Sequence, residues 1–337
     1  MKNKRIFLLG ATGQIGKELA YEFKKINTKE IICHSRTAVK SSFFNFQNIK
    51  NVVGELNDEK IVSEIKSADL IFELAAPDSG TLKEIKEFYK KRIDIVIPNM
   101  KKGSKFVFAS TMNAFGIDSR RKKLKNYIIP SSIYASNKRF AESYLNKIGV
   151  SNEVETYSLR LGEVHGKFQR ASLNILKLIK NNRVFEIPTT PAWITSISLI
   201  KDAIVNIISD KEKPGLYTLV CDNISWTELF STLGSKINIK PKYKIITSQK
   251  KSKKIKNIFY KTLSYYKDFF RGNFEISKDY EDLLKLQYRI NKLQNSINMN
   301  NKLKIYDEYN RYIGILPGKR FLSLKYNKDE VLKNLIT

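Results

Sequence analysis

Three glycines at a spacing of three residues, Gly10, Gly13 and Gly16, follow a short apolar run and precede a segment of helical periodicity. Residues 6–9 are typical of a buried parallel strand, and residues 17–23 place apolar side chains at the spacing of one helix face. In such a unit the first glycine permits a tight turn, the second lets backbone N–H groups reach phosphates, and the third lets helix and strand pack closely. Free N–H groups at the helix start also attract an anion. The stretch therefore predicts a site for a dinucleotide pyrophosphate.

A second group of residues with chemical potential is the pair Tyr134 and Lys138, which stand four residues apart. On a helix this spacing puts both side chains on one face, a turn from each other. Such a pair often occurs by chance and by itself indicates surface packing. Here an apolar run that ends in two hydroxyl side chains, Ser110 and Thr111, precedes the pair in the chain. The hydroxyl pair, the tyrosine–lysine pair and the glycine turn together support a functional interpretation that none supports alone.

The elements between these groups alternate in type along the chain. Apolar runs that indicate buried strands lie at 30–33, 51–56, 69–77 and 105–111, and helical patterns lie at 58–67 and 81–100. Pro98 stands near the end of the second helical segment, where a proline is a suitable terminator. Repeated strand–helix units predict an α/β fold with a doubly wound parallel sheet, whose ligands bind beyond the carboxyl ends of the strands. Ser110 and Thr111 lie at such an end.

The end of the second strand, where the adenosine ribose of a dinucleotide would lie, carries Ser35 and Arg36 and no carboxylate. Enzymes that use NAD usually place Asp or Glu there for the ribose 2′-hydroxyl, whereas an arginine accommodates the 2′-phosphate of NADP. The sequence therefore predicts NAD(P) and slightly favours NADP, with a solvated loop arginine as the alternative. Glu55 and Leu56 end the third strand and could flank the adenine. The small residues of 74–76 would let the cofactor pass closely.

The composition excludes several other classes of protein. With 337 residues, of which 42% are hydrophobic, the chain is long enough for one large domain and a smaller one. Two cysteines fit a reducing cytoplasm, and the two histidines show no metal-ligand spacing, so we expect no metal. The first strand begins at once and no apolar run approaches about 18 residues, so we expect neither a signal peptide nor a membrane span. The net charge of +28 is spread along the chain without a nucleic-acid motif, so we expect no nucleic-acid partner.

These residues resemble the short-chain dehydrogenase/reductase superfamily, in particular its extended branch of nucleotide-sugar epimerases, dehydratases and reductases. The resemblance spans about residues 4–235 and does not reach the C-terminal part. It rests on the glycine turn of 10–16, on 74–76, on 106–111 with Phe115 and Gly116, on 134–138 and on 159–162. With the strand-end argument, it gives these cofactor-contacting residues: Gly10, Thr12, Gly13, Gln14, Ile15, Gly16, Ser35, Arg36, Glu55, Leu56, Leu74, Ala75, Ala76, Tyr134 and Lys138.

Hydride transfer between a carbinol carbon and a nicotinamide requires a proton to leave or reach the oxygen, and the resemblance implies that Tyr134 is this general acid/base. A free tyrosine has a pKa of about 10, so work at neutral pH requires a lower value, which the positive charge of Lys138 favours. In the family this lysine also holds the nicotinamide ribose. Thr111, or Ser110 beside it, would hydrogen-bond the reacting oxygen. We expect Thr111, because it aligns best with the family's serine or threonine.

The residues expected near the substrate depart from the family pattern in two places. Where a dehydratase usually has Asp and Glu after the hydroxyl residue, this chain has Met112 and Asn113, which disfavours dehydration. Where the family often has Asn near the substrate's phosphates, this chain has Glu163, whose charge would repel a pyrophosphate. Either Glu163 points away or the substrate differs. His165 could contact the substrate or be an ordinary loop histidine, and Arg170 could meet phosphates instead.

We expect residues 1–160 to form the NAD(P)-binding Rossmann domain, completed by parts of 190–222, with a smaller α+β substrate-binding region at 161–247. We expect residues 248–337 to form a basic, largely helical extension, whose stretch 250–270 could contact a membrane surface, cover the substrate region or mediate dimer contacts. A homodimer is expected by analogy alone. Three functions stay open: an epimerase or reductase of a sugar or nucleotide sugar, an NADPH-dependent reductase of a small non-nucleotide carbonyl, and a non-catalytic dinucleotide-binding relative.

Overall fold

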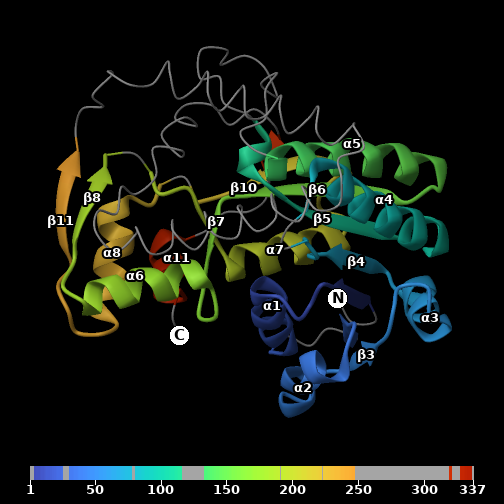
Figure 1. The fold of residues 1–337 in the computed structure, drawn as a ribbon, viewed down its shortest axis with the longest axis horizontal. Coiled ribbons are helices and arrows are strands. Elements are labelled where there is room, and N and C mark those ends of the chain that lie inside the picture. The colour runs from blue at the N-terminus through green and yellow to red at the C-terminus, as the bar shows by residue number, and fades with distance from the viewer. Residues whose placement is uncertain are drawn as a thin grey trace, which may run out of the picture.

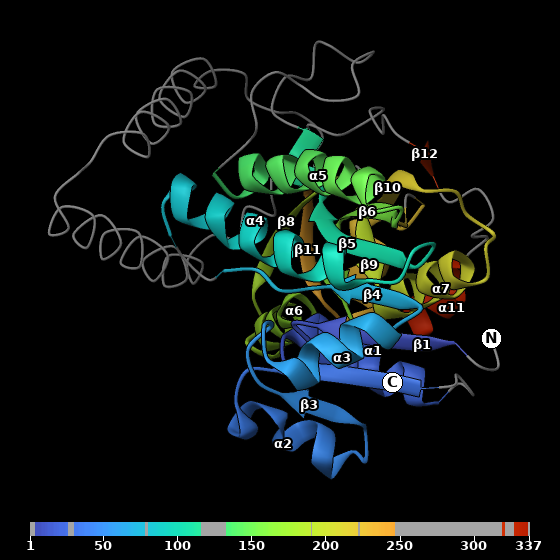
Figure 2. The same cartoon turned by 90° about the vertical axis from the view of Figure 1, so that its right-hand side faces the viewer.

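The centre of the protein is one eight-stranded parallel sheet with helices on both faces (Figure 1). The computed structural model describes residues 4–25, 30–77, 80–115, 133–189, 191–221, 223–246, 319–320 and 327–335. The sheet comprises β1 (Arg5–Leu9), β2 (Glu30–Ser35), β3 (Asn51–Val53), β4 (Leu70–Glu73), β5 (Lys105–Thr111), β6 (Glu155–Leu161), β10 (Gly215–Leu219) and β12 (Lys319–Arg320). The strand order is β12-β10-β6-β5-β4-β1-β2-β3, and Figure 2 shows it running from β12 at the top to β3 at the bottom. The order turns at β1 and β4, the place where such sheets bind ligands.

The strands are apolar on both faces, as a sheet covered on two sides requires. Along β1, Ile6 and Leu8 pack into one hydrophobic cluster, whereas Phe7 and Leu9 pack into another. Successive side chains of a strand point to opposite faces, so a single apolar run supplies both cores.

Helices cover both faces of the sheet, and these are α1 (Gln14–Lys24), α2 (Ala38–Phe46), α3 (Glu59–Ser67), α4 (Leu82–Asn99), α5 (Ile133–Ser151) and α7 (Ile197–Ile208). The first cluster receives side chains from α1, α2 and α7, and the second from α3, α4 and α5. Figure 1 shows β5 and β6 between the α4–α5 pair and α7. α4 begins at a capping box in which the Thr81 side chain accepts the Glu84 N–H and the Glu84 carboxylate accepts the Thr81 N–H. This box fixes the start of α4 after β4.

A smaller lobe follows the carboxyl end of β6. Its elements are β7 (Glu163–His165), α6 (Arg170–Lys180), β8 (Val184–Pro188), β9 (Ile194–Ser196), α8 (Trp226–Ser235) and β11 (Lys242–Ile246). β7 pairs with β9 and β8 with β11, both in parallel. Phe185 of β8 packs edge-on against Phe230 of α8 with ring centroids 4.2 Å apart, which holds the β8–β11 sheet on α8.

The described C-terminal residues return to this core. β12 lies beside β10, and α11 (Lys328–Lys333) packs on α8, where Lys328 forms an ion pair with Glu228. Leu335 is fully buried in the first cluster. The described parts of the predicted C-terminal extension therefore contribute to the main fold. Its predicted membrane contact at 250–270 lies outside the described residues, and none of the described helices is long and apolar enough to cross a membrane.

The predicted fold class, a doubly wound parallel α/β sheet, is confirmed. β5 has the predicted bounds, β2 runs on to Ser35, β3 ends at Val53 and β4 ends at Glu73. β10, from the predicted 190–222 segment, lies next to β6 in the sheet. The domain boundaries themselves stay a prediction.

Candidate active site

The turn between β1 and α1 has a different use for each of its three glycines. Gly10 has a φ of +70°, and a Cβ there would lie 2.4 Å from the backbone nitrogen of Ala75, so the chain turns and approaches the segment after β4. A Cβ on Gly16 would lie 2.5 Å from the Ala11 Cα, so this glycine lets α1 pack on the turn. Beside Gly13, the nearest protein atom to a Cβ is the Gly10 carbonyl oxygen at 3.3 Å. The space over Gly13 suits the close approach of a pyrophosphate.

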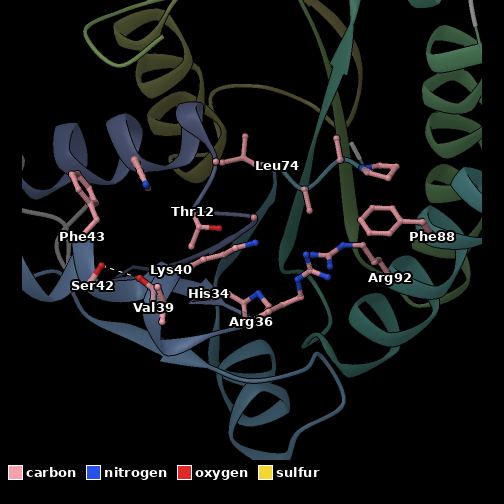
Figure 3. Close-up of a pocket in the computed structure, with 17 residues that line it drawn as sticks. Thr12, His34, Arg36, Val39, Lys40, Ser42, Phe43, Leu74, Phe88 and Arg92 are labelled. Atoms are coloured by element: carbon pink, nitrogen blue, oxygen red, sulfur yellow. Dashed lines mark hydrogen bonds between the residues drawn. The ribbon is translucent and has the colours of Figure 1, made fainter. Parts of the chain in front are cut away.

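A cleft of about 850 Å³ lies over this turn, between α2, α4 and the segment after β4 (Figure 3). Its volume is that of a small-molecule site. The predicted cofactor residues that line it are Gly10, Thr12, Gly13, Ser35, Arg36, Leu74, Ala75 and Ala76. The structure therefore brings together the glycine turn, the end of β2 and the small residues after β4.

Seven other predicted cofactor residues do not line this cleft: Gln14, Ile15, Gly16, Glu55, Leu56, Tyr134 and Lys138. Leu56 is buried in the second hydrophobic cluster, so it supports the core. The side-chain carbonyl of Gln14 accepts the Arg170 N–H at 3.1 Å, which links the turn to the start of α6. These residues have structural partners in this protein, and their contact with a cofactor stays a prediction.

The cleft is strongly positive. Lys17, Arg36, Lys40 and Arg92 line it, and no carboxylate of the described chain does. Lys40 comes from α2 and Arg92 from α4, whereas Arg36 follows β2. Burial, together with the charge of Arg92, lowers the pKa of His34, whose Nε2 lies 2.9 Å from the Gly54 carbonyl oxygen. The lowered pKa favours the neutral form of His34, and the charges of Lys17, Arg36 and Lys40, with that of Arg92 partly balanced by Glu73, favour a polyanionic ligand.

Tyr134 and Lys138 lie one turn apart on α5, and Lys138 contacts β5 directly. The Lys138 side chain is buried, and its Nζ donates a hydrogen bond of 2.6 Å to the Ala109 carbonyl oxygen. The same Nζ lies 5.7 Å from the centre of the Tyr134 ring. Ala109 precedes Thr111 by two residues on β5. The bond from Lys138 therefore places the tyrosine–lysine pair beside the strand end that carries the hydroxyl group.

Desolvation shifts the pKa values of both side chains of this pair. It lowers the pKa of Lys138 to about 8, against the opposing charges of Glu73 and Glu142. It raises the pKa of Tyr134 to about 12. Tyr134 is nevertheless 42% exposed among the described residues, and desolvation is the only cause of the rise, so the lowered tyrosine pKa expected beside Lys138 stays a prediction.

The two hydroxyl residues at the end of β5 have different partners. Ser110 Oγ donates to Glu142 Oε1 at 2.5 Å, and Glu142 also accepts two hydrogen bonds from Arg160, at 2.9 Å and 2.6 Å. This buried network ties β5 and β6 to α5. Thr111 is only partly buried, and its Oγ1 accepts the Asn113 N–H at 3.3 Å, which leaves its own O–H to donate. The geometry thus supports Thr111 over Ser110 as the residue that bonds a reacting oxygen.

Residues 6–184 match the NAD dependent epimerase/dehydratase family. The chain belongs to this family. Membership confirms the predicted resemblance, and the enzyme that the sequence predicts, an NAD(P)-dependent epimerase or reductase, falls in a family described as NAD dependent. No curated protein is similar enough in sequence to match the chain.

Solved structures with this fold include several members of the extended short-chain branch. The UDP-glucuronic acid 4-epimerase from Bacillus cereus, in complex with UDP-glucuronic acid and NAD, is 17% identical with a TM-score of 0.55, over 72% of this chain and 86% of that chain. A UDP-N-acetylglucosamine 4-epimerase from Methanobrevibacter ruminantium M1, in complex with UDP-N-acetylmuramic acid, is 18% identical with a TM-score of 0.58, over 74% of this chain and 87% of that chain. A Bordetella bronchiseptica enzyme in complex with NAD+ is 16% identical with a TM-score of 0.56, over 73% of this chain and 86% of that chain. At these identities the likeness shows a common fold.

The residues predicted near the substrate differ in their accessibility in this family member. Met112 is buried, and His165 is fully buried, with its ring nitrogens 3.1 Å from Ser172 Oγ and 3.4 Å from Glu163 Oε2. This arrangement fits the interpretation of His165 as an ordinary histidine. It also turns the Glu163 carboxylate toward the chain itself. Arg170 is exposed at the start of α6, and its contact with a substrate stays a prediction.

Sequence reasoning missed a link between the cofactor turn and the substrate lobe. Glu18 of α1 is buried, and its carboxylate accepts the N–H groups of Lys167 at 2.6 Å and Phe168 at 2.9 Å. A Cβ on Gly166 would lie 2.3 Å from the same carboxylate, so only glycine fits there. A charged residue at a helix position surrounded by core residues is the signal that could have revealed this link. No comparable signal marks Lys40 and Arg92, which are two of many basic residues in the chain.

Proposed function

We propose that this protein transfers hydride to or from a carbon of a sugar or nucleotide sugar, by epimerisation or reduction, with Tyr134, Lys138 and Thr111 as its reacting side chains. The observation that carries the proposal is the double contact of Lys138, which bonds the backbone of β5 and lies beside the Tyr134 ring. This contact gathers an acid/base, a cation and a hydroxyl at one strand end, where doubly wound sheets bind their ligands. The UDP sugars bound in structures with the same fold support the substrate class.

The residues present fit a dinucleotide. The open space over Gly13 and the N-terminus of α1 would receive the pyrophosphate, and Ala75 and Ala76 would flank the cofactor beside β4. Once bound, the nicotinamide supplies the hydride acceptor or donor, and the protein supplies position and proton transfer.

Tyr134 holds the proton at the substrate oxygen in this proposal. With a pKa of about 12, it is protonated at pH 7 and can donate when a carbonyl is reduced. In the oxidation direction it must accept the carbinol proton, and the adjacent ammonium of Lys138 favours the resulting phenolate. Thr111 donates a hydrogen bond to the same oxygen and orients it.

Among the cofactors, we propose that NADP is preferred. Arg36 follows β2 where a carboxylate would mark an NAD site, and Lys40 adds a second cation to that wall of the cleft. NADP suits a reductase, which exchanges its cofactor at every turnover, whereas an epimerase cycle retains NAD. A nucleotide sugar is preferred over a small carbonyl compound, because Glu163 faces His165 in this structure.

Replacement of Tyr134 by phenylalanine tests the reaction. The full chain is incubated with UDP-glucose, UDP-glucuronic acid or UDP-N-acetylglucosamine, and with their keto derivatives plus NADH or NADPH. Epimers are resolved by NMR, and cofactor oxidation is followed by absorbance. We expect Tyr134→Phe to lower turnover by about 10²–10⁴-fold, the usual contribution of a general acid/base, with cofactor affinity retained.

Tyr21→Phe, at a half-buried position of α1 beside Lys25, is the matched control and should keep full activity. The dinucleotide released on denaturation separates the two reaction types: retained NAD indicates an epimerase, and an empty protein that prefers NADPH indicates a reductase. Unchanged turnover in Tyr134→Phe would remove this tyrosine from its proposed role.

A further inference from the structure

Arg92, on α4, is fixed in place by a buried carboxylate. Its Nε donates to Glu73 Oε2 at 2.7 Å, and Glu73 Oε1 accepts the Ala75 N–H at 2.7 Å. Glu73 is 3% exposed and is the last residue of β4. The guanidinium is thereby held relative to the sheet, and a planar group held in this way loses little freedom when it binds a ligand.

The remaining edge of this guanidinium faces the cleft. Arg92 lines the cleft, and its Nη2 is buried with no hydrogen-bond partner in the described part of the chain. Figure 3 shows the guanidinium groups of Arg36 and Arg92 directed toward each other from the two walls of the cleft. Two like charges in this arrangement repel each other, and a buried donor without a partner is costly. An anion between the two groups would relieve both conditions.

We propose that Arg92 is a cofactor-specificity residue, which together with Arg36 clamps the 2′-phosphate of NADP. This inference rests on the proposed function, since the cleft must hold the dinucleotide. A 2′-phosphate carries about −1.5 to −2 charges at pH 7 and three acceptor oxygens, which suit the paired N–H groups of arginine. The 2′-hydroxyl of NAD offers no charge to either side chain. The positive charge of Arg92 lowers the pKa of His34 in β2. This effect agrees with a position of the Arg92 guanidinium near the end of β2.

Binding of three nucleotides to the full chain, stripped of dinucleotide, tests the clamp. The probes are 2′,5′-ADP, 5′-AMP and 3′,5′-ADP, the last of which has the charge of the first with the phosphate on the other hydroxyl. Titrations are made by calorimetry at one ionic strength, because salt screens these charges. We expect the wild type to bind 2′,5′-ADP at least tenfold more tightly than either of the other probes.

Arg92→Gln should weaken 2′,5′-ADP binding by at least tenfold, which is about 1.4 kcal/mol, and leave 5′-AMP binding within about twofold. Lys91→Gln removes the same charge from an exposed neighbouring position and should change neither affinity. Because Arg92→Gln leaves Glu73 without its ion-pair partner, the double variant Glu73→Gln/Arg92→Gln is measured in parallel, and the same selective loss is expected. Arg36→Ala should also lose the preference for 2′,5′-ADP. When Arg36→Ala and Arg92→Gln are combined, the loss of binding free energy should be smaller than the sum of the two single losses, because both arginines bind the same phosphate.

Equal affinity of the wild type for the three probes, or unchanged 2′,5′-ADP binding in Arg92→Gln, would overturn the clamp. The proposed function would survive that result if NADH or NADPH still bound to the protein. If the wild type bound no probe and no dinucleotide, the clamp and the proposed function would both fail.

Discussion

Lys138 should weaken the folded state at neutral pH, and its replacement by methionine can measure by how much. The side chain is 2% exposed, and its Nζ lies 4.5 Å from the Phe108 ring centre and 5.0 Å from that of Tyr89. Burial lowers its pKa from an ordinary 10.5 to about 8. Each pH unit corresponds to 1.36 kcal/mol, so keeping this amine charged in the folded protein costs about 3 kcal/mol.

The sign of the pH dependence follows from the two protonation states. Below pH 8 the amine is charged in both the folded and the unfolded chain, so the whole cost is present. Between the two pKa values the folded chain has released the proton and the unfolded chain still holds it, so stability rises with pH. Methionine has no such dependence. We therefore expect the free energy of unfolding of the wild type, minus that of Lys138→Met, to rise by about 2.5 kcal/mol from pH 7 to pH 10.

The assay is urea denaturation of both proteins at four pH values, with cofactor removed because bound dinucleotide would add its own stabilisation. The difference at a single pH also contains the lost hydrogen bond to the Ala109 carbonyl, so the change with pH is the informative quantity. Lys91→Met, at an exposed position of α4, should show no change relative to wild type. Parallel curves for the wild type and Lys138→Met would refute the reasoning, because they would mean that Lys138 titrates alike in the folded and unfolded chains.

Two further predictions separate structural from functional residues. Gly16→Ala should lower the melting temperature by several degrees, because its Cβ would meet the Ala11 backbone. Gly13→Ala should keep the melting temperature and weaken dinucleotide binding. Thermal melts and NADPH titrations check both variants, and a larger loss of melting temperature in Gly13→Ala than in Gly16→Ala would contradict this assignment. Glu142→Gln should destabilise the protein by about 3–5 kcal/mol because the buried Arg160 loses its ionic partner, and Arg160→Met added to it should recover much of that loss. Urea denaturation of the single and double variants checks this, and a loss in the double variant equal to the sum of both singles would argue against the pairing.

The local pattern of the sequence was enough to predict the helices and strands and the glycine turn at the cofactor site. The apolar run of residues 106–109 located β5, since the middle of a strand that is buried on both faces must be apolar. The spacing of Gly10, Gly13 and Gly16 predicted the turn, because each glycine answers a constraint that acts within the strand–turn–helix unit. Tyr134 and Lys138 were found for the same reason, as one helix turn separates them.

The tertiary structure decided which residues from distant parts of the chain contact each residue of the site. Thr111 and Ser110 are neighbours with similar side chains, and only the buried Glu142 on α5 engages Ser110 and leaves Thr111 available. Arg92 is one basic residue among many until Glu73 fixes it beside the cleft. Burial, which lowers the pKa of Lys138, depends on packing between elements far apart in the sequence. Periodicity reports which face of an element is apolar, but it carries no information on which element will cover that face, and the charge balance of the site depends on that choice.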